Sequence, residues 1–145
     1  MISAAMGDIQ IRQGDWQTLG TVCGEIRRVV FIEEQAVPEQ EEWDGRDPDC
    51  LHFLLVQNDR PLGTARLLPD GHIGRVAIRQ EGRGQGLGLM LMQAAIEAAR
   101  DAGHPEVLLD AQRHALPFYQ RLGFEAFGDE FLDAGIVHRL SLIHI

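Results

Sequence analysis

The sequence predicts one α/β domain in which a mostly antiparallel sheet also contains a parallel strand pair. Three strand-like runs with tight-turn residues between them follow one another over residues 51–78, which is typical of an antiparallel meander. A helix then connects Ile78 to Val107, and such a strand–helix–strand crossover normally makes its two strands parallel neighbours. Because 145 residues are enough for one substantial core, we expect a single domain over residues 1–145.

The first elements are a short strand and a helix. Residues 8–12 alternate polar side chains with isoleucines, which suits a strand. Asp15 or Thr18 can then cap a helix, which we expect over residues 18–31 because the apolar residues there fall on one helical face. Cys23 belongs to this apolar stripe and is expected to be a buried small side chain rather than a nucleophile.

Residues 32–49 are unusually acidic. The carboxylates are Glu33, Glu34, Glu39, Glu41, Glu42, Asp44, Asp47 and Asp49. So many like charges repel one another and resist burial, but Pro38 and Trp43 in their midst argue against a floppy linker. Two interpretations remain open, an acidic wall that selects a cationic substrate and a solvated loop.

The meander consists of three runs bounded by turn residues. The strands are expected at Leu51–Gln57, 62–68 and 72–78, with turns at 58–61 and 69–71. His52 lies within the first of these strands, so we expect its side chain to be hydrogen-bonded inside the sheet rather than to act in catalysis.

A glycine-rich stretch, Arg83-Gly84-Gln85-Gly86-Leu87-Gly88, precedes apolar residues at helical spacing. Three glycines at alternate positions favour a turn over a helix interior, so the stretch should lie at a helix N-terminus. Free backbone N–H groups and the positive end of the helix dipole favour an anion there. Glycine lets phosphate oxygens approach the amides, and Arg83 adds a charge. A plain strand-to-helix turn is the alternative.

Two other phosphate-binding loops fit this stretch less well. A P-loop needs Lys-Ser/Thr after its final glycine, whereas Leu89-Met90 follow Gly88. The dinucleotide fingerprint Gly-x-Gly-x-x-Gly lacks its third glycine here. Asp110 nevertheless lies near the distance expected for a ribose-binding acid, so a dinucleotide-binding domain stays an alternative.

The C-terminal third should complete the sheet. Gly103 ends the helix that follows the glycine loop, and residues 106–110 form the next strand. Pro117 suits the first turn of a short helix over Leu116–Arg121, which Gly123 ends. The last strands are expected at 124–127 and 136–140, separated by an acidic loop at 129–133, while 141–145 show no usable pattern.

Composition excludes several classes of function. A net charge of −9 argues against non-specific nucleic-acid binding, which needs Lys and Arg to replace the counterions of the phosphates. Cys23 and Cys50 lack the spacing of metal ligands, so no metal site is expected. There is neither a signal-peptide pattern nor an apolar run long enough to cross a bilayer. We therefore expect a cytoplasmic protein with reduced thiols and no membrane partner.

Two motifs resemble those of GNAT-superfamily N-acyltransferases. The first is the stretch that starts at Arg83, which matches the loop whose amides hold the pyrophosphate of acyl-coenzyme A. The second is Pro117-Phe118-Tyr119-Gln120-Arg121-Leu122-Gly123-Phe124. Residues 30–38 with 42–45, and Asp133-Ala134-Gly135-Ile136-Val137-His138, resemble the ElaA-like branch. The sequence departs from the pattern at Val137, where that branch usually has proline, and at Gln112, where many relatives in the superfamily have asparagine.

The resemblance implies a mixed sheet that is splayed near its centre, with helices on both faces and the cofactor between the strands at 72–78 and 106–110. Backbone groups of the first strand would pair with the pantetheine amides, and the glycine loop would face the diphosphate. The implied cofactor-binding residues are Val76, Ala77, Ile78, Arg83, Gly84, Gln85, Gly86, Leu87, Gly88, Leu89 and Gln112.

The activity implied by the resemblance is direct acetyl transfer from acetyl-CoA to a primary amine of a small molecule or peptide. A lysine-like amine with a pKa of about 10.4 must first lose a proton. Tyr119 is the matched general acid for the departing thiolate. Glu33 is the first candidate for the base, with Glu34 and His138 as alternatives. A homodimer stays open.

Two other classes of function also stay open. A dinucleotide- or CoA-binding sensor domain would bind its ligand without transferring a group. A pure interaction module would use the acidic segment to bind a basic partner.

Overall fold

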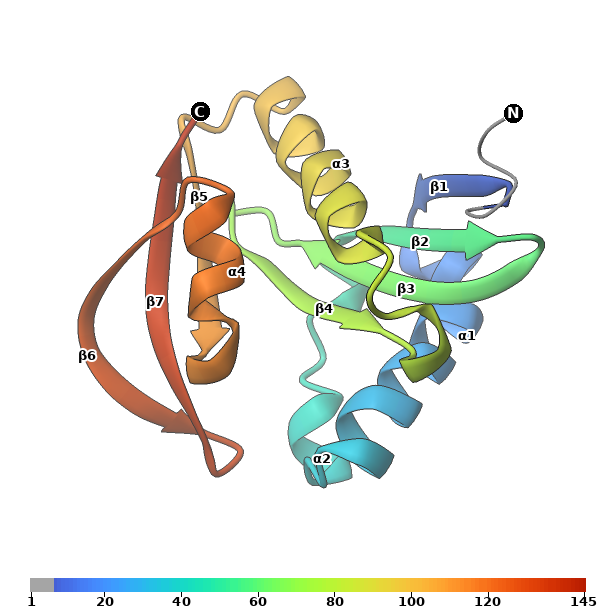
Figure 1. The fold of residues 1–145 in the computed structure, drawn as a ribbon, viewed down its shortest axis with the longest axis horizontal. Helices are drawn as coiled ribbons and strands as arrows, with labels where there is room; N and C mark the ends of the chain where they lie inside the picture. The colour runs from blue at the N-terminus through green and yellow to red at the C-terminus, as the bar shows by residue number, and fades with distance from the viewer. Residues whose placement is uncertain (1–6) are drawn as a thin grey trace.

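The computed structural model describes residues 7–145 and places two antiparallel sheets side by side (Figure 1). The first sheet has the order β1 (Ile9–Gly14), β2 (Leu51–Gln57), β3 (Arg60–Leu67) and β4 (Ile73–Ile78). The second has the order β5 (Glu106–Gln112), β7 (Ile136–His144) and β6 (Glu125–Asp133). The β2–β3–β4 pairing confirms the predicted antiparallel meander.

Within the described residues 7–145, a single parallel bridge joins the two sheets. It connects His72, just before β4, with Leu108 of β5, and the Leu108 amide donates to the Gly71 carbonyl over 3.2 Å. Beyond this point β4 and β5 diverge, and each is an edge strand of its own sheet among residues 7–145. This confirms the predicted α/β fold with a splayed parallel pair.

Helices cover both faces of the first sheet. Phe53 and Leu55 of β2 belong to the core that contains α3 (Leu87–Asp101), whereas Leu54 and Val56 pack in the cluster that contains α1 (Trp16–Arg27). This alternation follows from successive strand side chains pointing to opposite faces. The short helices are α2 (Glu39–Glu42) and α4 (Leu116–Arg121).

The first helix differs from its prediction at both ends. The Asp15 carboxylate accepts a hydrogen bond from the Thr18 amide over 2.8 Å and caps the helix, which therefore begins at Trp16. After Arg27 the chain widens into a π-helix, η1 (Arg28–Glu34), so the regular helix is shorter than expected. Cys23 is fully buried, as predicted.

The C-terminal hairpin also differs from its prediction. Residues 129–133 are the second half of β6 rather than an acidic loop, and Ser141–His144, for which the sequence showed no pattern, are the end of β7. The β6 strand is an edge strand with mostly exposed side chains, and its pairing with β7 is interrupted between Phe127 and Phe131. It therefore lacks the alternation that marks a strand in a sequence.

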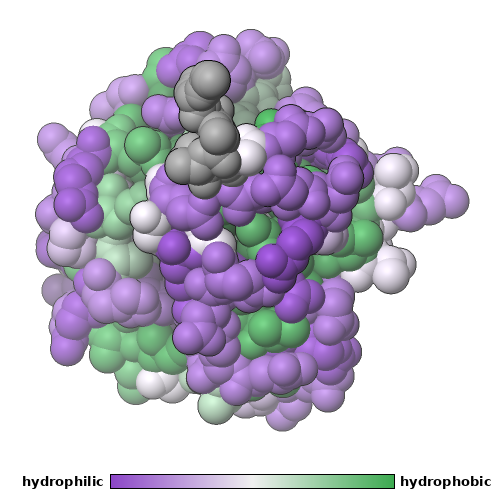
Figure 2. Space-filling view, turned by 45° about the vertical axis from the view of Figure 1, so that its right-hand side comes forward, coloured by the Kyte–Doolittle hydropathy of each residue, from purple (hydrophilic) through white to green (hydrophobic). Residues whose placement is uncertain are grey.

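One face of the molecule is largely polar. Figure 2 shows that hydrophilic residues predominate on this face and that apolar groups lie in separate patches. No helix among the described residues has the length and apolar character needed to span a bilayer.

Candidate active site

A cavity of about 830 Å³ lies where the two sheets separate. One wall is β4, and the opposite wall is formed by β5, β7 and α4. The end of η1 and the acidic segment complete the lining. A cavity of this size, between two strand edges, is large enough for a cofactor-sized ligand.

The glycine loop lies at the start of α3. Gly84 and Gly86 adopt the left-handed conformation, with φ of +81° and +80°, which favours glycine. A Cβ atom on either residue would meet nothing within 4 Å, so the space in front of the loop is open. Gly86 directly precedes α3, whose first backbone N–H groups have no partners within the helix. The residues present therefore fit a diphosphate group.

The residues that follow the loop divide between core and surface. Leu87 is buried, a Cβ on Gly88 would lie 3.6 Å from the Phe118 ring, and Leu89 is 40% exposed. Only backbone groups of these three residues can serve a phosphate. The Gln85 side chain instead accepts a hydrogen bond from Gln57 Nε2 over 2.9 Å.

Arg83 lies at the junction between the loop and the cavity, but its guanidinium is already engaged. Two nitrogens donate to the Glu34 carboxylate, each over 3.0 Å, and Nε donates to the Ile78 carbonyl over 2.8 Å. The Arg83 charge, which was expected to bind a phosphate, is therefore paired with the Glu34 carboxylate of η1. Glu34 competes with any anion for this guanidinium.

The free edge of β4 faces the cavity, and Val76, Ala77 and Ile78 are all part of its lining. The pairing with β3 contains a bulge: Gly74 lies opposite Arg66 and Ala77 opposite Thr64, so β4 has one extra residue. Arg75 lies within this bulge, with a left-handed φ of +51°. The bulge turns the strand edge at the point where it meets the cavity.

Tyr119 of α4 lies in the wall opposite β4. Its ring packs against Phe118 and Phe124, with ring centroids at 5.1 and 5.9 Å. Burial raises the pKa of the Tyr119 phenol to about 12. The hydroxyl is therefore protonated at neutral pH and can donate a proton or a hydrogen bond.

The three base candidates lie in different places. Glu33 is exposed and is not part of the cavity lining, whereas Glu34 and His138 both line the cavity. His138 is only 8% exposed and stacks on Phe131, with centroids 5.8 Å apart. Its Nδ1 lies 2.7 Å from the Ile136 carbonyl oxygen. A carbonyl can only accept, so Nδ1 carries a proton and the neutral ring has its lone pair on Nε2.

Gln112 links the two halves of the cavity. Its amide nitrogen donates to Gln35 Oε1 over 2.9 Å, which connects the end of β5 with the chain after η1. Both side chains line the cavity. The amide nitrogen of Gln112, which was predicted to bind the cofactor, is thus used for a hydrogen bond within the protein.

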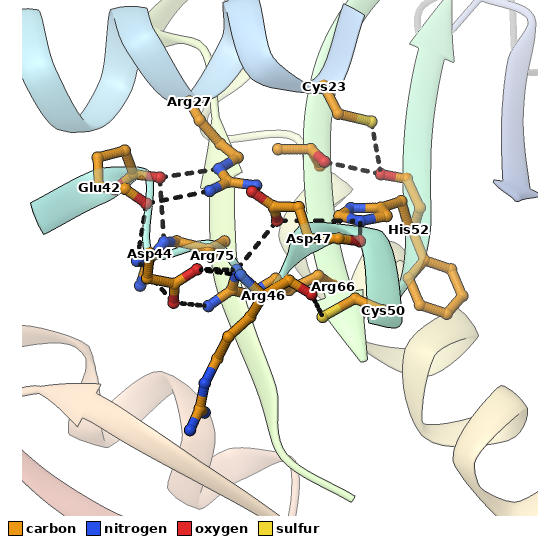
Figure 3. Close-up of polar contacts among 12 residues, drawn as sticks. Cys23, Arg27, Glu42, Asp44, Arg46, Asp47, Cys50, His52, Arg66 and Arg75 are labelled. Atoms are coloured by element: carbon orange, nitrogen blue, oxygen red, sulfur yellow. Dashed lines mark hydrogen bonds and ion pairs between the residues drawn. The ribbon is translucent and has the colours of Figure 1, made fainter. Parts of the chain in front are cut away.

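The acidic segment is neither a solvated loop nor a simple acidic wall, because arginines neutralise its buried carboxylates (Figure 3). Glu42 and Asp47 are 2% and 4% exposed, and Arg27 donates to both, over 2.8 and 2.7 Å. Arg66 donates to Asp44 over 2.6 Å and to Asp47 over 2.9 Å. Sequence reasoning missed this network, since its arginines come from α1, β3 and β4.

The charges of Asp44, Asp47 and Arg66 are stabilised by their partners in the network. Burial alone would raise the pKa values of Asp44 and Asp47. For Asp44, hydrogen bonds from Arg66 and from the Arg46 amide outweigh burial and hold the pKa below its ordinary range. For Asp47, hydrogen bonds and charge from Arg27 and Arg66 have the same effect on the pKa. For Arg66, the same pairing outweighs burial and raises the pKa of the guanidinium. His52 Nε2 lies 2.9 Å from the Asp47 carbonyl oxygen. This histidine is buried and hydrogen-bonded, but its partner lies before β2 and not within the sheet as predicted.

Comparison with known proteins agrees with this geometry. The profile of the acetyltransferase (GNAT) domain matches residues 23–139. The uncharacterized N-acetyltransferase YjcF of Bacillus subtilis (strain 168) is 36% identical over 117 residues, which cover 78% of this chain and 84% of that protein.

Two solved structures are also similar. An acyl-CoA N-acyltransferase from Pseudomonas aeruginosa superposes with a TM-score of 0.84 at 32% identity, and covers 93% of this chain and 99% of its own. Escherichia coli ElaA superposes with a TM-score of 0.83 at 29% identity, and covers 92% of this chain and 98% of its own. The chain therefore belongs to the GNAT acetyltransferase family and, as the likeness to ElaA shows, to its ElaA-like branch.

Proposed function

We propose that this protein transfers an acetyl group from acetyl-CoA to a primary amine of a small molecule or peptide. The observation that carries the proposal is the cavity between the diverging edges of β4 and β5, which has an open glycine loop near one end and Tyr119 in its wall. Family membership provides a CoA-linked acyl donor, and the acetyl group and the amine acceptor are the finer parts of the proposal.

The chain's own residues would hold the donor mainly through backbone groups. The free N–H groups at the start of α3, next to Gly84 and Gly86, face open space and suit the diphosphate. The unpaired edge of β4 at Val76–Ile78 offers backbone groups to the amides of the pantetheine arm. When bound, the donor supplies an activated thioester.

Tyr119 is proposed as the general acid. Collapse of the tetrahedral intermediate expels a thiolate, and a proton donor nearby lowers the barrier to that step. A phenol with a pKa of about 12 stays protonated over the working pH range. The proton is therefore present when the sulfur leaves, although the raised pKa makes the phenol a weaker acid.

His138 is the base that the geometry supports, in place of Glu33. Glu33 lies outside the cavity lining, and Glu34 is held by Arg83 in a bidentate ion pair. The hydrogen bond from Nδ1 to Ile136 fixes the His138 ring and leaves the Nε2 lone pair free to take the amine proton, directly or through water.

The acceptor is proposed to be a cation when it arrives. Asp110 and Asp133 line the cavity and have no ion-pair partner among residues 7–145, in contrast to the buried carboxylates of the acidic segment. A screen of amines, polyamines, aminoglycosides and peptide N-termini with acetyl-CoA would identify the acceptor. All thirteen Lys and Arg residues of the chain are arginine, so acetyllysine found in such a screen comes from the acceptor.

Binding of the donor is the first test. Acetyl-CoA at 100 times its Kd should stabilise the protein by about 2.7 kcal/mol in a thermal shift assay. If acetyl-CoA gives no shift, the proposed function is wrong. A shift with a nicotinamide dinucleotide but none with acetyl-CoA would select the dinucleotide-binding alternative.

Tyr119→Phe tests the acid. This change keeps the ring packing and removes only the hydroxyl, so acetyl-CoA affinity should stay the same while kcat with the identified acceptor falls roughly 100-fold. Steady-state kinetics across pH measure both quantities. An unchanged kcat would remove Tyr119 from the mechanism.

His138→Gln tests the base in a similar way. Glutamine preserves a hydrogen-bond donor but cannot accept a proton, so kcat should fall roughly 100-fold at neutral pH. Glu33→Gln is the matched control and should retain the kcat of the unmodified protein. The reverse result, with loss of activity only in Glu33→Gln, would return the role to Glu33.

A further inference from the structure

We propose that Arg75, held by Glu42 and Asp44, is a positioning residue that keeps the free edge of β4 in shape for the pantetheine arm of the donor. This inference rests on the proposed function, because it assigns a role to residues around the proposed donor slot. It also gives the buried part of the acidic segment a task other than selecting a substrate.

The backbone of Arg75 is strained. A φ of +51° is uncommon for a residue with a side chain, and such a conformation persists only when the surroundings hold it. Here the conformation creates the bulge by which β4 gains one residue relative to β3. The residues on either side of Arg75, Gly74 and Val76, line the cavity.

The Arg75 side chain contacts several oxygen atoms of the acidic segment (Figure 3). Its Nε lies 3.0 Å from Glu42 Oε2, and NH2 donates to the Glu42 carbonyl over 3.0 Å. NH2 also donates to the Glu41 carbonyl over 3.3 Å. NH2 also lies 3.4 Å from Asp44 Oδ2. The side chain is 22% exposed, so most of it is fixed inside the protein.

The partners of Arg75 are themselves fixed. Glu42 Oε2 also accepts from Arg27 Nε over 2.8 Å, and Asp44 accepts from Arg66 over 2.6 Å. Arg66 is the residue of β3 directly opposite Gly74, the residue before Arg75. The network therefore connects the two strands on either side of the bulge. Moving Arg75 would therefore require several buried ion pairs to rearrange together.

The consequence falls on the edge of β4. If Arg75 returned to an ordinary extended conformation, the extra residue would slide along the strand and every following backbone group would change its direction. Val76, Ala77 and Ile78 supply the edge that is proposed to pair with the pantetheine arm. The glycine loop lies beyond the end of the strand and does not contact Arg75.

Arg27 provides a matched control. It belongs to the same network and shares Glu42 with Arg75, but it comes from α1 and does not line the cavity. Replacing either arginine by lysine keeps the charge and removes the planar fork of donors. A purely structural role for the network predicts similar consequences for both changes.

The experiment compares Arg75→Lys and Arg27→Lys by calorimetric binding of two probes. Coenzyme A reports the loop and the strand edge together, whereas adenosine 3′-phosphate 5′-diphosphate, which lacks the pantetheine arm, reports the loop alone. We expect Arg75→Lys to weaken coenzyme A binding about tenfold, or about 1.4 kcal/mol, without changing the affinity for the nucleotide probe. Arg27→Lys should leave both affinities unchanged, although either variant can lower the melting temperature.

Other outcomes separate the inference from the proposed function. If the unmodified protein binds coenzyme A and Arg75→Lys binds it equally well, the inference is overturned and the proposed function stands. If the unmodified protein does not bind coenzyme A, both the inference about Arg75 and the proposed function are wrong. Should Arg75→Lys fail to fold, Asp44→Asn replaces it, because Asp44 lies at the more exposed side of the network. We then expect the same loss of coenzyme A affinity without a change in affinity for the nucleotide probe. An unchanged coenzyme A affinity would overturn the inference.

Discussion

The glycine loop and the acidic segment border the same cavity but owe their structures to different interactions. The loop takes its shape from neighbours in sequence, with left-handed glycines at 84 and 86 followed directly by α3. The acidic segment takes its shape from distant arginines, among them Arg27 on α1 and Arg66 on β3. The glycine loop is therefore encoded locally, whereas the acidic segment depends on the whole fold.

The largest expected effect comes from breaking the network at Asp47. The Asp47 side chain is 6% exposed and pairs with both Arg27 and Arg66. Asp47→Asn leaves these buried cations undercompensated, so the free energy of unfolding should fall by about 3–5 kcal/mol. Denaturant unfolding measures this, and coenzyme A affinity of the folded fraction should not change.

Asp49→Asn is the control for this change. Asp49 lies with Asp47 in the short 3₁₀ helix Asp47–Asp49, but it is exposed. The free energy of unfolding of Asp49→Asn should match that of the unmodified protein. Equal stability of the two variants would mean that the acidic segment does not depend on its buried ion pairs.

The opposite result is expected on the donor side. Gly86→Val places a branched side chain at a φ of +80° and in the open space before α3. Coenzyme A affinity should fall about 100-fold, or about 2.8 kcal/mol, because the side chain blocks the amides. The cost to folding from the left-handed backbone should be only roughly 1–2 kcal/mol.

Gly103→Val separates these two effects. Gly103 follows the other end of α3, has a φ of +90° and also faces open space. This variant should lose a similar amount of stability and bind coenzyme A normally, as calorimetry would show. Weakened binding in both variants would mean that strain in α3, and not the loop, governs affinity.

The smallest effect concerns Tyr119, the only tyrosine of the chain. Since burial raises its pKa from about 10 to about 12, tyrosinate absorbance should not develop in the folded protein until well above pH 10. The sign of the linkage follows: the folded state holds this proton more tightly, so stability should fall as pH rises from 10 to 12. Titration of the phenol near pH 10 in the folded protein would contradict the buried environment.

The same contrast explains what could be predicted from the sequence. The meander, the helix after the glycine loop and the short helix Leu116–Arg121 carry their own turn residues and apolar periodicity, and the structure confirms them. The β7 strand was only partly predicted because two of its buried residues, His138 and Ser141, are polar and hide the alternation. A period of 3.6 residues also cannot distinguish an α-helix from the π-helix that follows Arg27.

The site divides along the same line. The glycine loop and the edge of β4 were predicted as cofactor-binding elements from motifs and from the resemblance. In the structure Val76–Ile78 and Arg83 line the cavity, and the space in front of Gly84 and Gly86 is open. The pairing of Arg83 with Glu34 could not be predicted, because it joins residues 49 positions apart on separate elements. The sequence left two interpretations of the acidic segment open for the same reason, because it does not say which carboxylates pair with a buried arginine.

The single bridge between His72 and Leu108 has a consequence for association with other chains. An unpaired strand edge is normally a template on which another protein can add a strand, and exposed edges promote aggregation. Here the edge of β4 faces a cavity whose other side is formed by β5 and α4, and these elements stand in the way of an approaching second sheet. The splay thus keeps two strand edges available to a slender, extended ligand while shielding them from the edges of neighbouring proteins.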